Sequence, residues 1–402
     1  MNLDSIISPA KSRFSARFSH ALLDDLMYRG DAPADEATVA LHEEKYDPDG
    51  SQLRNLRKLA RDGEPRAKAF FLRAEQRPEW LDDELLARGQ SVALECSHHY
   101  GMSLMHSLFA GAIFARATLV TASTGRLGSN PGRRIQETGS FIGALLTPGG
   151  LEPGALGFET AVRVRLLHGS IRSWIKRSPG FQESYLGEPI DQTMLAMTLG
   201  LFDYLNLRSM SRMGISLSAN DIAAHHHLWR YVGYLIGIDE VLLTESVEEE
   251  RELWSALVAH QAFPELFGPS YLDLAVKTVG GLSGAGSAHQ AFIRNLFLHL
   301  SGGEWFGTEE NVFPDPVVTA FRAGSFTLGT ARQWVPGVSW MLGAYGTQQL
   351  KAARSLAAKH KFGVELEVED EAPNEELQVE VLAEGVRARL AQPARTARAD
   401  LR

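Results

Sequence analysis

The sequence predicts an all-α protein that forms a single large helical domain. Apolar residues recur at helical spacing along most of the chain, as Phe18, Leu22 and Leu26 do within the range 15–28. No β-hairpin pattern and no internal repeat interrupts this spacing. Hydrophobic residues make up 44% of the 402 residues, which is enough for a large core.

The chain divides into three ranges by its helical periodicity and its composition. Residues 1–80 suggest short helices broken by turns, and we expect them to form an N-terminal extension packed on the core. Residues 81–362 are expected to form the main helical domain, which opens with a long helical region that breaks near Gly101. Residues 363–402 are first acidic and then rich in Ala and Arg, so we expect a partly disordered tail.

Composition excludes several classes of protein. The formal net charge is −9, and no basic stripe with interleaved aromatic residues is present, so we expect no nucleic-acid partner. A single cysteine, Cys96, excludes an intramolecular disulfide and a zinc ribbon and suits a reducing compartment. The N-terminus has no secretory pattern, and no run of about 18 apolar residues predicts a transmembrane segment. We therefore expect a soluble, cytoplasmic protein, and the sequence leaves its oligomeric state open.

The common enzyme motifs are absent from the sequence. It contains no G-x-G-x-x-G fingerprint, no Walker loop, no G-x-S-x-G elbow and no H-E-x-x-H pair. This excludes the usual nucleotide enzymes, esterases and zinc proteases. After these exclusions, a helical domain that binds a large buried ligand remains as a natural interpretation.

The range 159–177 is the strongest candidate for a functional helix. On a helix, Arg165, His168 and Arg172 share one face, and apolar residues cover most of the rest. Three polar groups on a buried helix need partners. A planar, dianionic and mostly apolar ligand such as haem would satisfy them, with His168 on the iron and the two arginines on the propionates. The alternative is that the arginines pair with Asp or Glu elsewhere and that His168 is a hydrogen-bonded core histidine.

Two other groups of histidines resemble metal ligands. His99 and His106 are seven residues apart and could share a helix face, although zinc ligands usually lie three or four residues apart. Residues 225–227 are three consecutive histidines, which point about 100° apart on a helix and are not expected to converge. We interpret both groups as core histidines.

Four groups of residues occur in an order that is typical of a known family. They are Arg134-x-x-x-Thr138, then Arg163-Val-Arg165-Leu-x-His168-x-x-x-Arg172, then Gly187-x-Pro189-Ile190-x-Gln192, and last Trp229-x-x-x-Gly233 with Leu235-x-Gly237. Between about Ala110 and Asp239 the chain resembles the family of the latex-clearing proteins (rubber oxygenases) and of the oxygenase of mycophenolic acid biosynthesis.

The resemblance implies a globin-like core with one haem b. It implies that His168 is the proximal iron ligand, flanked by Arg165 and Arg172, and that Arg134 and Thr138 lie on the distal side. Latex-clearing proteins carry a lysine directly before this threonine, where the present chain has Glu137.

Two further departures concern the substrate. The zone near Thr118 lacks the catalytic acid of the latex-clearing proteins, and we find no export leader. Some other apolar small molecule is therefore a better expectation than polyisoprene.

Glu137 and Thr138 each leave two interpretations open. Glu137 could be an acid–base group that moves protons in the distal pocket, or a carboxylate that the dipole of a helix N-terminus favours. Thr138 could donate a hydrogen bond to oxygen, or bond the preceding turn of its own helix.

The sequence therefore predicts a haem b-dependent oxygenase that acts with O2 on a hydrophobic, alkene- or isoprenoid-like small molecule. Its expected catalytic residues are Arg134, Glu137 and Thr138, and its expected haem-binding residues are His168, Arg165, Arg172 and Arg134. One alternative is a non-catalytic haem-binding sensor or carrier, and another is a haem-free helical protein that binds an acid. Substrate identity, the number of oxygen atoms transferred, the electron donor and the distal ligand are not predicted.

Overall fold

The computed structural model of the chain describes residue 3 and residues 9–44, 51–123, 131–177, 187–282, 286–306 and 315–359. Within these ranges the chain is helical, and the only strand-like pairing is an isolated antiparallel bridge between Phe114 and Ala262. The predicted all-α fold is confirmed.

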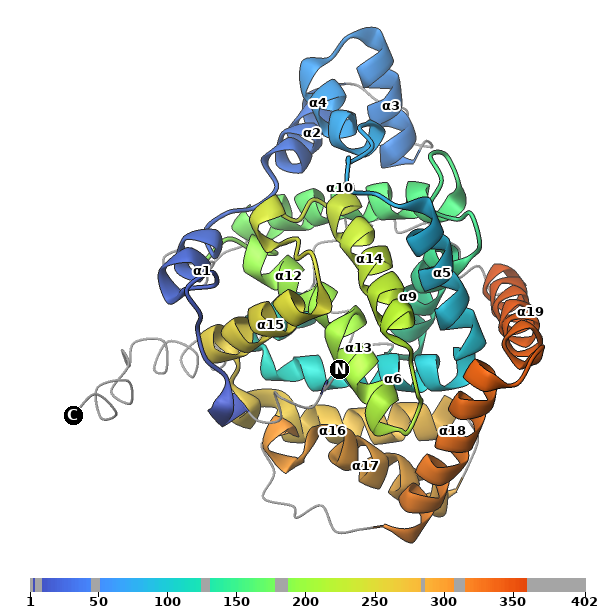
Figure 1. Cartoon of the computed structure of the whole chain (residues 1–402). Helices are drawn as coiled ribbons and strands as arrows, with labels where there is room; N and C mark the ends of the chain where they lie inside the picture. Colours follow the sequence, from blue (N-terminus) through green and yellow to red (C-terminus); the bar gives the residue numbers. More distant parts are fainter. Residues whose placement is uncertain are drawn as a thin grey trace.

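The helices form three groups along the chain (Figure 1). The N-terminal group holds α1 (His20–Leu26), α2 (Ala32–Glu43), α3 (Gln52–Asp62) and α4 (Pro65–Glu75). The central group holds α5 (Asp83–Glu95), α6 (Ser97–Ala110), α7 (Ala115–Ser123), α9 (Pro131–Leu146), α10 (Leu156–Arg177), α12 (Gln192–Phe202), α13 (Tyr204–Arg212), α14 (Ala219–Leu235) and α15 (Val247–Gln261). The C-terminal group holds α16 (Pro264–Leu282), α17 (Ser287–Ser301), α18 (Pro316–Trp334) and α19 (Val338–Lys359).

The three groups are stacked in the molecule. Figure 1 shows α2, α3 and α4 together at one end, with α10 beneath them and α12 to α14 at the centre. Helices α16 and α17 lie at the opposite end, and α19 runs along the edge beside α5. The first 80 residues do form short helices, as predicted. The predicted division at residue 80 stays a prediction, and the predicted tail lies outside the described residues.

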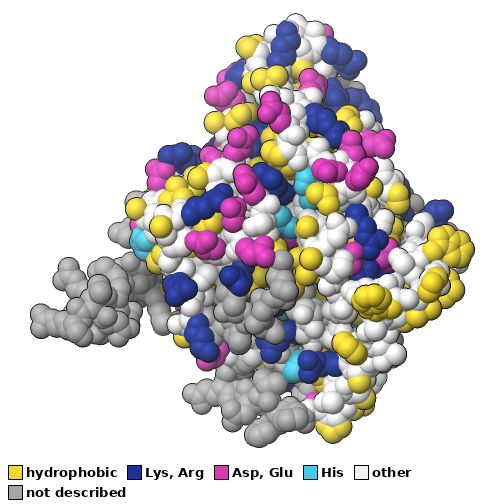
Figure 2. All heavy atoms as spheres, viewed as in Figure 1, with side chains coloured by type: hydrophobic (Ala, Val, Ile, Leu, Met, Phe, Trp, Pro, Cys, Tyr) yellow, Lys and Arg dark blue, Asp and Glu magenta, His cyan; other side chains and the backbone are white. Residues whose placement is uncertain are grey.

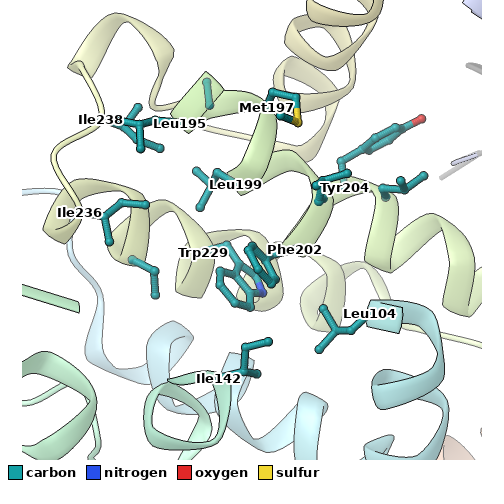
Figure 3. Packing of buried hydrophobic residues seen from close by; sticks show 14 of the residues in the cluster. Leu104, Ile142, Leu195, Met197, Leu199, Phe202, Tyr204, Trp229, Ile236 and Ile238 are labelled. Carbon is teal, nitrogen blue, oxygen red and sulfur yellow. The ribbon is translucent and has the colours of Figure 1, made fainter. Parts of the chain in front are cut away.

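The hydrophobic core is centred on α12 and α14. The rings of Phe202 and Trp229 are stacked with centroids 4.9 Å apart, and aliphatic side chains of both helices surround them (Figure 3). Trp229, Trp254 and Trp305 are all fully buried. Burial of large aromatic side chains of this kind is a major source of stability, because each removes a large apolar area from water.

Helix α5 packs closely along α14. A Cβ atom at Gly89 would clash with the backbone carbonyl of Ala224, so only glycine permits this approach. An ion-pair cluster joins the same region to α18, in which Arg88 and Arg332 both bind the carboxylates of Glu95 and Asp221.

The predicted break near Gly101 is wrong. The chain breaks at Cys96, between α5 and α6, whereas Gly101 lies within α6. A Cβ atom at Gly101 would meet nothing within 4 Å, so this glycine faces open space and does not mark a turn. Glu95 instead ends α5 in the ion-pair cluster, which fixes the chain at that point.

Candidate active site on helix α10

Helix α10 carries the predicted cluster and is held between α2 and α9. Two glycines allow this close packing. A Cβ atom at Gly157 would lie 2.6 Å from the carbonyl oxygen of Ala144 in α9, and one at Gly169 would lie 2.7 Å from that of Ala34 in α2. The helix is therefore fixed between both neighbours by backbone-to-backbone approach.

Arg165 is almost completely enclosed and is bound by the carboxylate of the residue directly before α2. Its Nε and Nη2 donate to the two oxygens of Asp31 at 2.6 and 2.9 Å, and its Nη1 donates to the carbonyl of Phe70 at 3.1 Å. This bidentate pairing is the strongest common geometry between arginine and a carboxylate. Removing either partner would leave a buried charge without compensation.

The second arginine, Arg172, is bound less completely. Its Nε donates to Asp35 at 2.7 Å, and its Nη1 donates to the carbonyl of Ile190 at 3.0 Å. Ile190 is β-branched and has a φ of 51°, a strained conformation that the surrounding structure must impose. The buried Nη2 has no hydrogen-bond partner among the described residues. One donor of this guanidinium group is therefore available to an anionic ligand.

The carboxyl group of Asp35 has an altered proton affinity. Burial raises its pKa to about 6, although the guanidinium group of Arg172 opposes this shift. The Arg172–Asp35 pair is therefore ionised near neutral pH and loses its negative partner below about pH 6.

These two ion pairs match the alternative interpretation of the arginines. Both guanidinium groups already bind carboxylates of α2, so no ligand is needed to neutralise them. The assignment of Arg165 and Arg172 to haem propionates stays a prediction. Sequence reasoning missed Asp31 and Asp35. The pattern Asp31-Ala-Pro33 predicts a helix start, but its pairing with a helix 134 residues later depends on the tertiary structure.

The family-like residues Gln192 and Gly237 support the same junction. The side-chain amide nitrogen of Gln192 donates to the carbonyls of Gly30 and Gly237 at 2.9 and 3.2 Å, and its oxygen accepts from the backbone of Asp239 at 2.7 Å. Gly237 has a φ of 90°, and a Cβ atom there would clash with Asp31. Both residues therefore secure the segment that carries Asp31 against α10.

The imidazole of His168 lies on a more open side of α10. It is half-buried, as are Val164 and Ile171, which occupy the same side four residues before and three residues after it. Neighbours on the other sides of the helix, such as Leu166 and Gly169, are buried. The histidine therefore lies in a partly accessible, aliphatic strip.

Helix α9 supplies the other predicted residues. Glu137 and Thr138 are both half-buried, and α9 packs against α10. Arg134 lies in the first turns of α9, but its side chain is outside the described part of the structure. The predicted catalytic roles of these three residues stay predictions.

His99 and His106 occupy buried hydrogen-bonded positions, as expected. His99 Nε2 lies 2.9 Å from Ser325 Oγ, and His106 Nδ1 lies 2.8 Å from Ser209 Oγ. The expectation that the three consecutive histidines do not converge was wrong for His225 and His226. Their Nδ1 atoms reach the two oxygens of one carboxylate, that of Asp203, at 3.1 and 2.6 Å. A carboxylate offers two separated acceptors, so adjacent helical residues can share it.

Comparison with known proteins identifies the family. Residues 95–388 match the family model described as "ER-bound oxygenase mpaB/B'/Rubber oxygenase, catalytic domain". The chain belongs to this family. It is 23% identical over 296 residues to the rubber oxygenase of Streptomyces sp. (strain K30), covering 68% of this chain and 69% of that protein.

A solved structure confirms the fold. A latex clearing protein in its closed state superposes with a TM-score of 0.51 at 19% identity, covering 87% of this chain and 96% of that one. The resemblance inferred from the ordered residues is therefore confirmed, and the protein is an oxygenase. No helix among the described residues is long and apolar enough to cross a membrane.

The residues of α10 fit a haem group on two counts. His168 offers an imidazole within an aliphatic strip, and an imidazole nitrogen beside apolar side chains would be suited to hold the iron of a haem. Arg172 lies one turn further along the helix and carries the buried Nη2 that has no described partner. A propionate oxygen is a suitable acceptor for that N–H.

Proposed function

We propose that this oxygenase depends on haem b and acts with O2 on a hydrophobic small molecule of alkene or isoprenoid type. The observation that carries the proposal is the pairing on α10 of a half-buried imidazole, His168, with an unsatisfied guanidinium donor, Arg172 Nη2. The family supports the oxygen chemistry, because a related protein bears the name rubber oxygenase. Arg165 is already neutralised by Asp31, so this proposal assigns it to no acid group of a ligand.

Each residue has a defined task in this proposal. The bound haem would supply O2 binding and activation. His168 would hold its iron through an imidazole nitrogen, and Arg172 would donate from Nη2 to a propionate. Arg165 acts as a positioning residue, because its bonds to Asp31 and Phe70 fix α10 against the N-terminal helices.

The residues of α9 would transfer protons and orient the reacting oxygen. The carboxylate of Glu137 would take up or release a proton beside the substrate, and the hydroxyl of Thr138 would donate a hydrogen bond to oxygen. Arg134 would stabilise negative charge on the same side. The apolar strip that includes Val164 and Ile171 would exclude water and receive a hydrocarbon substrate.

The substrate is expected to be an apolar small molecule other than polyisoprene. Near Thr118 the described ionisable group is Arg116, whose guanidinium is paired with the buried Asp191. Asp191 in turn caps α12 and accepts from Thr193, so its carboxylate is fully engaged. No free acid therefore replaces the missing glutamate among the described residues there.

An absorption spectrum of the purified protein tests the cofactor. We expect a Soret band, after haem supplementation if necessary, that shifts on reduction with dithionite and on addition of imidazole. His168→Ala should remove the imidazole that would hold the iron and change the spectrum, and added imidazole should partly restore it. His98→Ala, which removes an exposed histidine, is the matched control. An unchanged spectrum in His168→Ala would reject this ligand, whereas a colourless wild-type protein would reject haem itself.

A further inference from the structure

The most exposed apolar surface of the described chain lies on α18 and α19. Eight of the thirteen exposed large hydrophobic side chains among the described residues fall between residues 317 and 345. Such concentration on two consecutive helices differs from the single, scattered apolar residues of an ordinary surface, so it indicates an interaction site.

We call α18, α19 and the turn between them the aromatic hairpin and define it by seven exposed side chains. They are Phe326 and Leu328 of α18, Trp334 and Val335 at the turn, and Trp340, Met341 and Tyr345 of α19. Figure 2 shows hydrophobic side chains gathered along the edge of the molecule where α18 and α19 lie in Figure 1.

The two tryptophans are exposed to a rare degree. Trp334 and Trp340 keep 77% and 76% of their surface in water, whereas Trp229, Trp254 and Trp305 are fully buried. Tryptophan carries a large apolar body with one N–H donor, which suits the boundary between lipid tails and water.

The opposite face of α19 is already packed on the protein. A Cβ atom at Gly346 would clash with the backbone of Leu94 in α5, so this side of α19 lies directly against α5. Trp340, Met341 and Tyr345 point about 100° or more away from Gly346 on the helix, and their side chains are exposed. The hairpin is therefore anchored along one face and presents the other outward.

The charge of this segment differs from that of the whole chain. Residues 315–359 contain five Lys or Arg and one acidic residue, Asp315, in a chain with net charge −9. Arg332 is neutralised by Glu95 and Asp221, whereas Lys351 and Arg354 are exposed on α19. A surface that combines exposed Trp and Tyr with basic residues complements an anionic lipid surface.

We propose that the aromatic hairpin docks the protein on the surface of an anionic lipid bilayer. The tryptophans would insert at the level of the headgroups, and Lys351 and Arg354 would bind lipid phosphates. No membrane-spanning helix is needed for this mode of binding. The inference does not depend on the haem or on the proposed reaction, because it rests on α18 and α19 alone.

Co-flotation of the full-length protein with lipid vesicles tests the docking. One vesicle preparation contains phosphatidylglycerol and phosphatidylcholine, and the other contains phosphatidylcholine alone. We expect the wild-type protein to float with the first preparation and much less with the second. The double variant Trp334→Ser/Trp340→Ser should bind at least tenfold more weakly. Leu72→Ser, which removes an exposed leucine from α4, is the matched control and should float like the wild type.

A second variant tests the contribution of the two basic side chains separately from that of the tryptophans. Lys351→Gln/Arg354→Gln should weaken binding to the anionic vesicles about fivefold per charge removed. It should also reduce the dependence on salt, while binding to phosphatidylcholine alone stays unchanged. Circular dichroism of every variant checks that the helices are retained.

Two results would overturn the proposal. The first is that the full chain does not float with either preparation. The second is that the tryptophan variant floats as well as the wild type. Light scattering after size-exclusion chromatography then identifies another occupant. A doubled mass that the tryptophan substitutions abolish would assign the hairpin to a second copy of the chain, and an unchanged mass would point to residues 360–402.

Discussion

The buried pair Arg165–Asp31 offers the sharpest test of how α10 is held. Both side chains are almost completely enclosed, and two hydrogen bonds of 2.6 and 2.9 Å join them. Replacing either residue by leucine leaves the other charge buried without its partner. We expect each single variant to lose about 3–5 kcal/mol of unfolding free energy.

The double variant Arg165→Leu/Asp31→Leu should recover most of this loss, because no buried charge remains. Asp31 makes no side-chain capping bond to α2, so its replacement does not also remove a helix cap. The pair Arg29–Asp25 on the surface of α1 is the matched control, with both side chains more than half exposed. Its loss should cost under about 1 kcal/mol.

Urea denaturation followed by circular dichroism at 222 nm measures these differences, and the Soret absorbance of the same samples reports haem content. Single variants that lose no more than the surface control would refute the reasoning. A double variant that regains stability and keeps haem assigns Arg165 to positioning. A double variant that regains stability but loses haem would instead show that Arg165 binds the cofactor directly.

Two further predictions concern proton transfer and pH. Glu137→Gln should lower the rate of substrate oxidation while the haem content stays unchanged. Glu152→Gln, on the exposed connection between α9 and α10, is the control. An unaltered rate in Glu137→Gln would mean that Glu137 is structural. Burial alone would raise the pKa of Asp203, but the imidazoles of His226 and His225 outweigh it and lower the pKa to about 2. The ionised carboxylate therefore stabilises the fold above about pH 4 by about 2 kcal/mol, and this contribution is lost as the pH falls towards 2. Unfolding free energies of wild type and Asp203→Asn, measured from pH 6 downwards, should converge in acid; a constant gap would contradict the shift.

The fold class and the position of the candidate site followed from local pattern. Helical periodicity with no strand signal indicated an all-α protein, because the 3.6-residue repeat is set by backbone geometry alone. The ordered motifs from Arg134 to Gly237 indicated the family. Sequence spacing also placed Arg165, His168 and Arg172 on one helix, α10.

The partners of these residues were decided by the tertiary structure. Asp31 and Asp35 come from a helix more than 130 residues earlier in the chain, and no local rule links them to α10. The break at Cys96 likewise depends on an ion-pair cluster built from three helices. Periodicity in the sequence shows which side of a helix is apolar. Which residue pairs with a buried charge depends instead on how distant segments pack. Because an unpaired buried charge costs several kcal/mol, roughly, the pairing partner is specific.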